Sequence, residues 1–216
     1  MNLFSQLDEE LQPTHEVLAE GAVLMRGRAR REDGLLLAGV EAVARAVPFR
    51  QMATPGGYRM SVAMTSCGRV GWVSDSERNG YAPGDPEARR MWPGMPEGFR
   101  ELARASAEEA GFKGFEPDTC LINRYQAGAK LGLHQDRHER DFRQPIVSVS
   151  LGLAAVFLWG GFERTEATKR ILLEHGDVLV WGGASRLRFH GVMPLKPGVH
   201  ERTGVYRYNL TFRRVG

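Results

Sequence analysis

The chain has 216 residues, and its hydrophobic and charged fractions of 42% and 25% are those of an ordinary soluble globular domain. Its formal net charge of +3 is compatible with a polyanionic partner but does not require one. The two cysteines form no CxxC pair, which excludes a disulfide framework and indicates a reducing compartment.

The N-terminal residues become acidic at once and contain no apolar run. Neither a signal peptide nor a membrane span is therefore expected, and the expected location is the cytoplasm. No internal repeat or linker divides the chain. We expect an N-terminal extension over 1–19 and a single domain over 20–216.

Two helices are predicted in the first half of the chain. Apolar residues recur on one helical face over 33–47, and Pro48 ends the pattern. A second helix is predicted over 97–110, opened by Pro96 and closed by Gly111.

The stretch between these helices has a different character. An alternating strand is predicted over 58–65, entered through the Pro-Gly-Gly turn at 55–57. Residues 66–93 are rich in Gly, Pro and Arg and show little periodicity. A loop of that length in a compact domain favours a lid or a binding surface, which we place at about 48–96.

From residue 119 onward, short apolar runs alternate with turn signals. We predict strands over 119–126, 130–134, 146–153, 155–160, 169–174, 177–181, 186–192 and 204–213. Eight short strands without intervening helices are typical of an antiparallel jelly roll or barrel. The fold class is therefore mostly β (α+β), with a jelly-roll core at 119–214 braced by the helices.

The first chemical signal is His134-Gln135-Asp136. On a strand, residues two apart face the same side, so an imidazole and a carboxylate can enter one cavity. His190, 56 residues after His134, is a candidate third ligand, although a histidine packed in the core is the alternative. Two histidines and one carboxylate fit a non-haem Fe(II) oxygenase site.

Other metal sites are less well supported. His15, His175 and His200 lie in polar stretches or turns. A His-Glu-x-x-His motif and paired cysteines, which would indicate zinc, are both absent from the sequence.

The last predicted strand carries polar side chains on one face, with an edge strand exposed to water as the alternative interpretation. These residues are Arg207, Asn209, Thr211 and Arg213. The strand at 119–126 adds Asn123 and Tyr125 on a single face, so together the strands could bind a small dicarboxylate. The two arginines are six residues apart, roughly 20 Å along a strand, so they are expected at different ends of the ligand.

The combined motifs resemble the AlkB family of dioxygenases that repair alkylated nucleobases. The runs that carry the resemblance are PFRQM (48–52), TPGGY (54–58), LINRY (121–125), LHQD (133–136), PIVSVSLG (145–152), LEHGDV (173–178), WGG (181–183) and RYNLTFR (207–213). The likeness covers about residues 20–214. It implies a double-stranded β-helix with a nucleotide-recognition lid.

The resemblance also implies roles for individual residues. Fe(II) would be bound by the catalytic triad His134, Asp136 and His190. 2-Oxoglutarate would be held by Asn123, Tyr125, Arg207, Asn209 and Arg213, with Arg207 nearest its distal carboxylate. The substrate would be contacted by Trp72, Tyr81, His138, Arg164, Thr54, Tyr58, Met60 and Ser61, with the flipped base between Trp72 and His134.

The implied reaction is oxidative demethylation of 1-methyladenine and 3-methylcytosine, using Fe(II), 2-oxoglutarate and O2 and releasing formaldehyde, succinate and CO2. The expected partner is alkylated DNA, single-stranded by preference, with RNA as a further substrate, no membrane, and a monomeric enzyme. Two alternatives stay open: a related dioxygenase acting on a protein or small molecule, and a non-catalytic nucleic-acid-binding jelly roll.

Two features depart from the family pattern. The spacing from Trp72 to Tyr81 is longer, and His138 replaces the usual carboxylate two residues after the metal aspartate.

Overall fold

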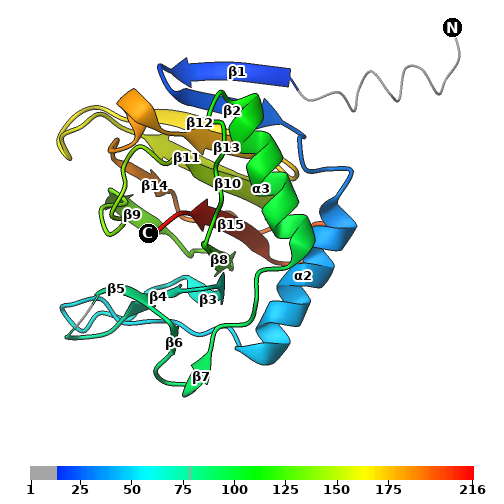
Figure 1. The fold of residues 1–216 in the computed structure, drawn as a ribbon, viewed down its shortest axis with the longest axis vertical. Coiled ribbons are helices and arrows are strands. Elements are labelled where there is room, and N and C mark those ends of the chain that lie inside the picture. Colours follow the sequence, from blue (N-terminus) through cyan, green and yellow to red (C-terminus); the bar gives the residue numbers. More distant parts are fainter. Residues whose placement is uncertain (1–13, 78) are drawn as a thin grey trace, which may run out of the picture.

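The fold is built on two antiparallel sheets, seen in a computed structural model that describes residues 14–77 and 79–216 (Figure 1). In spatial order, the seven-stranded sheet contains β1 (Thr14–Ala19), β2 (Ala22–Arg26), β13 (Val178–Trp181), β10 (Ile146–Gly152), β15 (Arg207–Arg213), β8 (Thr119–Tyr125) and β3 (Ala63–Gly68). The four-stranded sheet contains β12 (Lys169–Leu173), β11 (Ala155–Trp159), β14 (His190–Val192) and β9 (Leu131–His134). This architecture confirms the predicted mostly β jelly roll.

Two helices cover one face of the larger sheet, α2 (Asp33–Ala46) and α3 (Glu97–Glu109) (Figure 1). Buried residues on α3 recur at the spacing of one helical face and pack with those of α2 into a single apolar core. The helices approach closely because Gly39 has no side chain: a Cβ there would lie 2.6 Å from the Phe99 ring. Both predicted helices are confirmed to within one residue at each end.

The strand β15 shows how the sheet separates an apolar face from a polar one. Leu210 and Phe212 point into the core beneath the helices. Asn209 alternates with them and is paired across the sheet with Asn123 on β8 and Ser150 on β10. Because paired residues on neighbouring strands share a face, polar side chains from three strands meet between the two sheets.

The region at 66–93, predicted as a loop, contains two small hairpins. These are β4 (Gly71–Ser74) with β5 (Asn79–Ala82), and β6 (Gly84–Asp85) with β7 (Arg90–Met91). They gather at the end of the molecule away from β1 (Figure 1). The prediction of an irregular loop was wrong because strands of two to four residues are too short to show an alternating pattern.

Three other strand predictions began too early, among them the strand predicted over 204–213, which begins at Arg207. The predicted strand at 58–65 begins only at Ala63, because the backbone N–H groups of Thr54 and Met60 are bonded within the local turn, to Tyr58 and Met52. The strand predicted over 186–192 begins at His190, after the 3₁₀ turn η1 (Gly183–Ser185).

The N-terminal strands β1 and β2 were not predicted from the sequence. β1 occupies residues 14–19 of the expected extension and pairs with β2. Residues 1–13, the rest of that extension, lie outside the described part. Among the described residues, no helix is both long and apolar enough to cross a membrane.

Candidate active site

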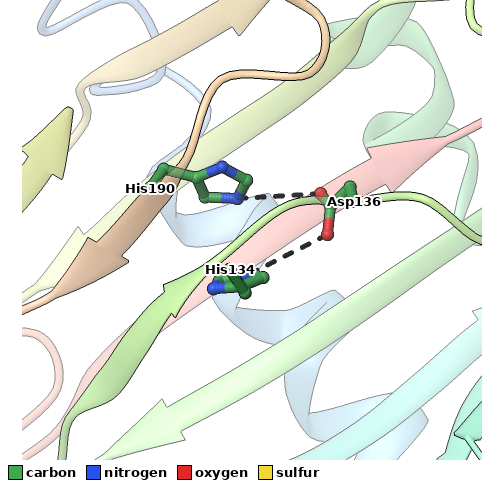
Figure 2. Close-up of side chains that lie close together, drawn as sticks. All are labelled: His134, Asp136 and His190. Atoms are coloured by element: carbon green, nitrogen blue, oxygen red, sulfur yellow. Dashed lines mark ion pairs between the residues drawn. The ribbon is translucent and has the colours of Figure 1, made fainter. Parts of the chain in front are cut away.

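Three potential metal ligands converge at the end of the four-stranded sheet (Figure 2). His134 ends β9, His190 begins β14, and the two are register partners, while Asp136 follows β9 by two residues. Their imidazole Nε2 atoms lie 3.9 Å and 3.8 Å from the carboxylate oxygens of Asp136. Among the described residues, His134, Asp136 and His190 form a group of three side chains of the types that bind metals. Their nitrogen and oxygen donor atoms all lie within 4.8 Å of one another.

The orientation of both imidazoles is fixed by backbone carbonyls. Nδ1 of His134 lies 2.9 Å from the carbonyl oxygen of Gly132, and Nδ1 of His190 lies 3.0 Å from that of Arg188. Because a carbonyl only accepts, Nδ1 carries the proton in each ring. The Nε2 lone pairs are left free toward Asp136, as metal ligation requires.

Electrostatics keep the site in a metal-binding protonation state. Burial alone would raise the pKa of Asp136, but the neighbouring Arg213 holds that pKa well below its ordinary range. Arg213 donates to one Asp136 oxygen from Nε at 2.9 Å and from Nη2 at 2.7 Å. Burial, together with the neighbouring His134, lowers the pKa of His190 to about 3. An ionised carboxylate and neutral imidazoles are the ligand forms that a divalent metal binds.

A cavity of about 300 Å³ opens from these three side chains between the two sheets and extends under the lid. Its lining includes His134, Asp136 and His190, the lid residues Met60 and Trp72, His138 from the segment after β9, and the polar sheet residues Asn123, Tyr125, Ser148, Asn209, Thr211 and Arg213. The volume is at the lower end of those that bind small molecules.

The polar end of this cavity has the chemistry of a dicarboxylate site. Asn123 Oδ1, Arg207 Nε and Arg213 Nη1 are buried without a hydrogen-bond partner. Arg207 does not line the cavity; its guanidinium is buried behind it and donates to Ser150 Oγ at 2.9 Å and to the Leu153 carbonyl at 3.3 Å. Unpaired donors are costly to bury, so guanidinium donors without partners fit an anionic ligand.

The structure brings together only part of the predicted substrate set. The His138 ring meets the Trp72 ring edge-on with centroids 4.9 Å apart, and Tyr81 meets Trp72 at 5.3 Å. Thr54, Tyr58, Ser61, Arg164 and Tyr81 do not line the cavity. Tyr58 is 79% exposed at the tip of the lid, and Ser61 Oγ donates to the Lys130 carbonyl.

Two residues that sequence reasoning missed connect the lid to the metal end. The Glu139 carboxylate accepts from Tyr81 Oη at 2.6 Å and from Arg186 Nη2 at 3.0 Å. Arg186 also donates to the carbonyl of Asp136 at 2.9 Å. Both side chains are at most 5% exposed, yet Glu139 lies in a charged run, where a solvated carboxylate is the usual case. The sequence carries no signal for their pairing.

Comparisons with known proteins agree with this geometry. The family model of the 2OG-Fe(II) oxygenase superfamily matches residues 21–213. The chain is 54% identical over 207 residues, 96% of each chain, to the "Alpha-ketoglutarate-dependent dioxygenase AlkB" of Escherichia coli (strain K12). It is 44% identical over 110 residues, 45% of this chain and 24% of the relative, to the "DNA N(6)-methyladenine demethylase ALKBH1D" of Arabidopsis thaliana.

A solved structure extends the similarity to three dimensions. The structure of OsALKBH1 matches with a TM-score of 0.80 and 28% identity, covering 93% of this chain and 100% of that chain. α-Ketoglutarate is 2-oxoglutarate, so the family fits the metal-ligand set and the anionic end of the cavity. The chain belongs to the AlkB family of 2-oxoglutarate- and Fe(II)-dependent dioxygenases.

Proposed function

We propose that this enzyme removes methyl groups from the ring nitrogens of nucleobases in DNA, with 1-methyladenine and 3-methylcytosine as its substrates. The observation that carries the proposal is the continuity of one cavity, from the two histidines and Asp136 to the aromatic lid residue Trp72. A planar, largely apolar base needs an aromatic surface close to the oxidising centre.

In this proposal His134, Asp136 and His190 hold Fe(II). Arg213 orients the Asp136 carboxylate and keeps it ionised, and the carbonyls of Gly132 and Arg188 keep both Nε2 atoms unprotonated. With iron bound, 2-oxoglutarate and O2 supply an oxidation that gives succinate and CO2 and hydroxylates the N-methyl group, which then leaves as formaldehyde.

The polar end of the cavity binds 2-oxoglutarate. Its ligands are Asn123, Tyr125, Arg207, Asn209 and Arg213. The Tyr125 phenol stays protonated, because burial raises its pKa to about 12, and it can donate a hydrogen bond to a carboxylate. The buried Arg207 would supply positive charge at the end away from the metal, and Arg213 at the metal end.

The base would lie between Trp72 and His134, beneath the lid. Trp72 is held by the T-shaped contact with Tyr81, whose hydroxyl is fixed by Glu139. Met60 and His138 close the sides of the cavity. Thr54, Tyr58, Ser61 and Arg164 lie outside it and would contact the sugar-phosphate backbone or neighbouring nucleotides.

An unpaired base reaches such a cavity without the free-energy cost of opening a duplex, which favours single-stranded DNA, with RNA as a further substrate. We further propose that the enzyme acts as a monomer in the cytoplasm. The domain would comprise residues 20–216, with its lid at about 48–96 and its catalytic core at 119–214, and β1 of the N-terminal extension adds an edge strand to its larger sheet.

The test is anaerobic reconstitution with Fe(II), followed by O2 and 2-oxoglutarate together with oligonucleotides containing either lesion. Mass spectrometry should show both oligonucleotides losing one methylene, with formaldehyde and succinate formed in equal amounts. Intact oligonucleotides in a preparation that turns over 2-oxoglutarate would contradict a nucleobase substrate and favour a protein or small-molecule substrate. A preparation that forms no succinate would contradict catalysis itself.

A further inference from the structure

The loop that joins β11 to β12, residues 160–168, lies beside the metal end of the cavity. β11 ends at Trp159, which is the register partner of His190. Gln135 lies between His134 and Asp136 in the sequence. Its side-chain amide donates to the carbonyl oxygen of Phe162 at 3.5 Å. Gln135 itself lines the cavity, so this hydrogen bond connects the loop to the cavity wall at its metal end.

The loop presents an aromatic ring to solvent. Phe162 is 48% exposed, and the guanidinium of Arg188 lies 4.8 Å from its ring centroid. The same guanidinium lies 5.8 Å from the ring of Trp159 and donates to the Gly160 carbonyl at 3.0 Å. The three side chains form a stack whose inner end is buried and whose outer end, Phe162, is open.

The backbone of the loop is held rigid. The Glu166 carboxylate accepts from the N–H groups of Phe162 at 2.8 Å and Glu163 at 2.7 Å. A side chain at Gly161 would overlap that carboxylate, with its Cβ 2.1 Å from the nearest oxygen. Backbone bonds in both directions between Phe189 and the two glycines at 160–161 attach the loop to the start of β14. The Phe162 ring is therefore preorganised, and little conformational entropy would be lost on stacking.

The charge beside the ring suits a polyanion. Arg164 is exposed, its guanidinium lies 5.0 Å from the Phe189 ring centroid, and it donates to the carbonyl of Leu133. Of the two acids on the loop, Glu166 uses one carboxylate oxygen on the backbone N–H groups, which leaves Glu163 facing solvent. One guanidinium, that of Arg188, thus lies over the exposed Phe162 ring, and a second, that of Arg164 on the same loop, lies over Phe189. Aromatic rings accompanied by arginines are typical of surfaces that bind unpaired nucleotides.

We propose that Phe162, supported by Arg188 and flanked by Arg164, is a stacking platform for the unpaired base that neighbours the target base on the same strand. The inference rests on the proposed nucleic-acid substrate and deepens it. It assigns the loop at 160–168 to recognition of the strand outside the cavity, and it explains why an aromatic ring is left exposed there. The enzyme would read at least two nucleotides: the target in the cavity and one neighbour on the loop.

The test is a double-mutant cycle between the protein and the strand. One partner is Phe162→Ala, and the other is a pentanucleotide with central 1-methyladenine in which the 5′ or 3′ neighbour is abasic. Dissociation constants are measured by fluorescence anisotropy on the Fe(II)-loaded enzyme with 2-oxoglutarate, kept anaerobic to prevent turnover. We expect Phe162→Ala to weaken binding of the complete pentanucleotide about tenfold, within the range that base–aromatic stacking gives. The loss should disappear when one particular neighbour is abasic.

Matched variants separate stacking from other effects. Phe162→Trp should bind the complete strand as tightly as the wild type or more tightly, because it keeps the ring. Leu172→Ala removes an apolar side chain of similar exposure, 49%, on the outer strand β12, and should change nothing. A Phe162→Ala loss that persists with either neighbour abasic, or no loss at all, overturns the inference. A wild-type enzyme that demethylates none of these strands overturns the proposed function instead.

Discussion

The two faces of the seven-stranded sheet are built from the same strands and have opposite characters. Beneath the helices, Leu210 and Phe212 pack into a continuous apolar core. On the other face, Asn209, Thr211 and Arg213 alternate with them and border the cavity. Successive side chains of a strand point to opposite faces of the sheet, so one strand contributes to both the packed face and the cavity face.

The faces also differ in how completely their polar groups are paired. Asn123 Oδ1, Arg207 Nε and Arg213 Nη1 are buried without partners on the cavity side. Each such group costs roughly 1–3 kcal/mol unless a ligand satisfies it. The helix-covered face therefore stabilises the fold. The unpaired polar groups of the cavity face lower the stability of the ligand-free protein, and a bound ligand can pair with them. Substitutions on each face test this division.

The largest effect is expected at the metal end. His134→Ala removes one of the three proposed metal ligands and should lower Fe(II) affinity and succinate formation by more than about 100-fold, since loss of an outer-sphere partner alone costs 10- to 100-fold. The melting temperature of the metal-free protein should change little. Equilibrium dialysis and succinate assays measure both effects. His15→Ala, in the half-exposed pair with Glu109, is the control and should retain full activity. Comparable losses in the two variants would contradict the assigned site.

Phe212→Ala tests the helix-covered face. The fully buried Phe212 ring meets Phe99 edge-on at 5.9 Å, so its removal should lower the free energy of unfolding by about 3–5 kcal/mol. Urea denaturation measures this loss. The dissociation constant of 2-oxoglutarate should stay unchanged where the variant is folded, although Arg213 is the next residue. Weakened 2-oxoglutarate binding would show that the two faces are not independent.

Arg207→Met tests the cavity face, where a substitution should weaken ligand binding and leave the stability of the fold nearly unchanged. In the proposed role, Arg207 supplies positive charge to the distal carboxylate of 2-oxoglutarate, so its loss should raise the KM for 2-oxoglutarate at least about 30-fold, with little change in the KM for the oligonucleotide. Stability should be nearly unchanged, because replacing a buried ion by an apolar side chain of similar volume is often neutral. Arg124→Met is the matched control: Arg124 lies on β8 facing the other way, over Phe49 and Tyr206. An equal effect of both variants would contradict a specific role for Arg207.

The same division explains what the sequence could predict. Alternation along β15 and the spacing of His134 and Asp136 are local patterns. The polar face of β15 and the pairing of these two candidate ligands could therefore be predicted from the sequence. The convergence of His190 with them depends on the β14–β9 pairing, which local patterns do not determine. The hairpins of the lid and the Glu139–Arg186 pair depend on tertiary contacts between segments far apart in the chain. Sequence patterns reveal burial and alternation, but not which buried charges will pair.

The smallest effect is expected at His138, two residues after Asp136 on the border of the cavity. His138 lies against the edge of Trp72 and is exposed, so a change there should leave the fold intact. An imidazole can donate or accept a hydrogen bond, whereas an ionised carboxylate only accepts. His138→Asp should therefore change the ratio of turnover on 1-methyladenine and 3-methylcytosine about two- to tenfold, the effect of one hydrogen bond of about 0.5–1.5 kcal/mol. Competition assays with both oligonucleotides in one reaction measure the ratio directly.

His138→Asn keeps a donor and an acceptor without the charge, and should change the ratio less. Identical ratios in all three proteins would show that His138 has no part in choosing the lesion.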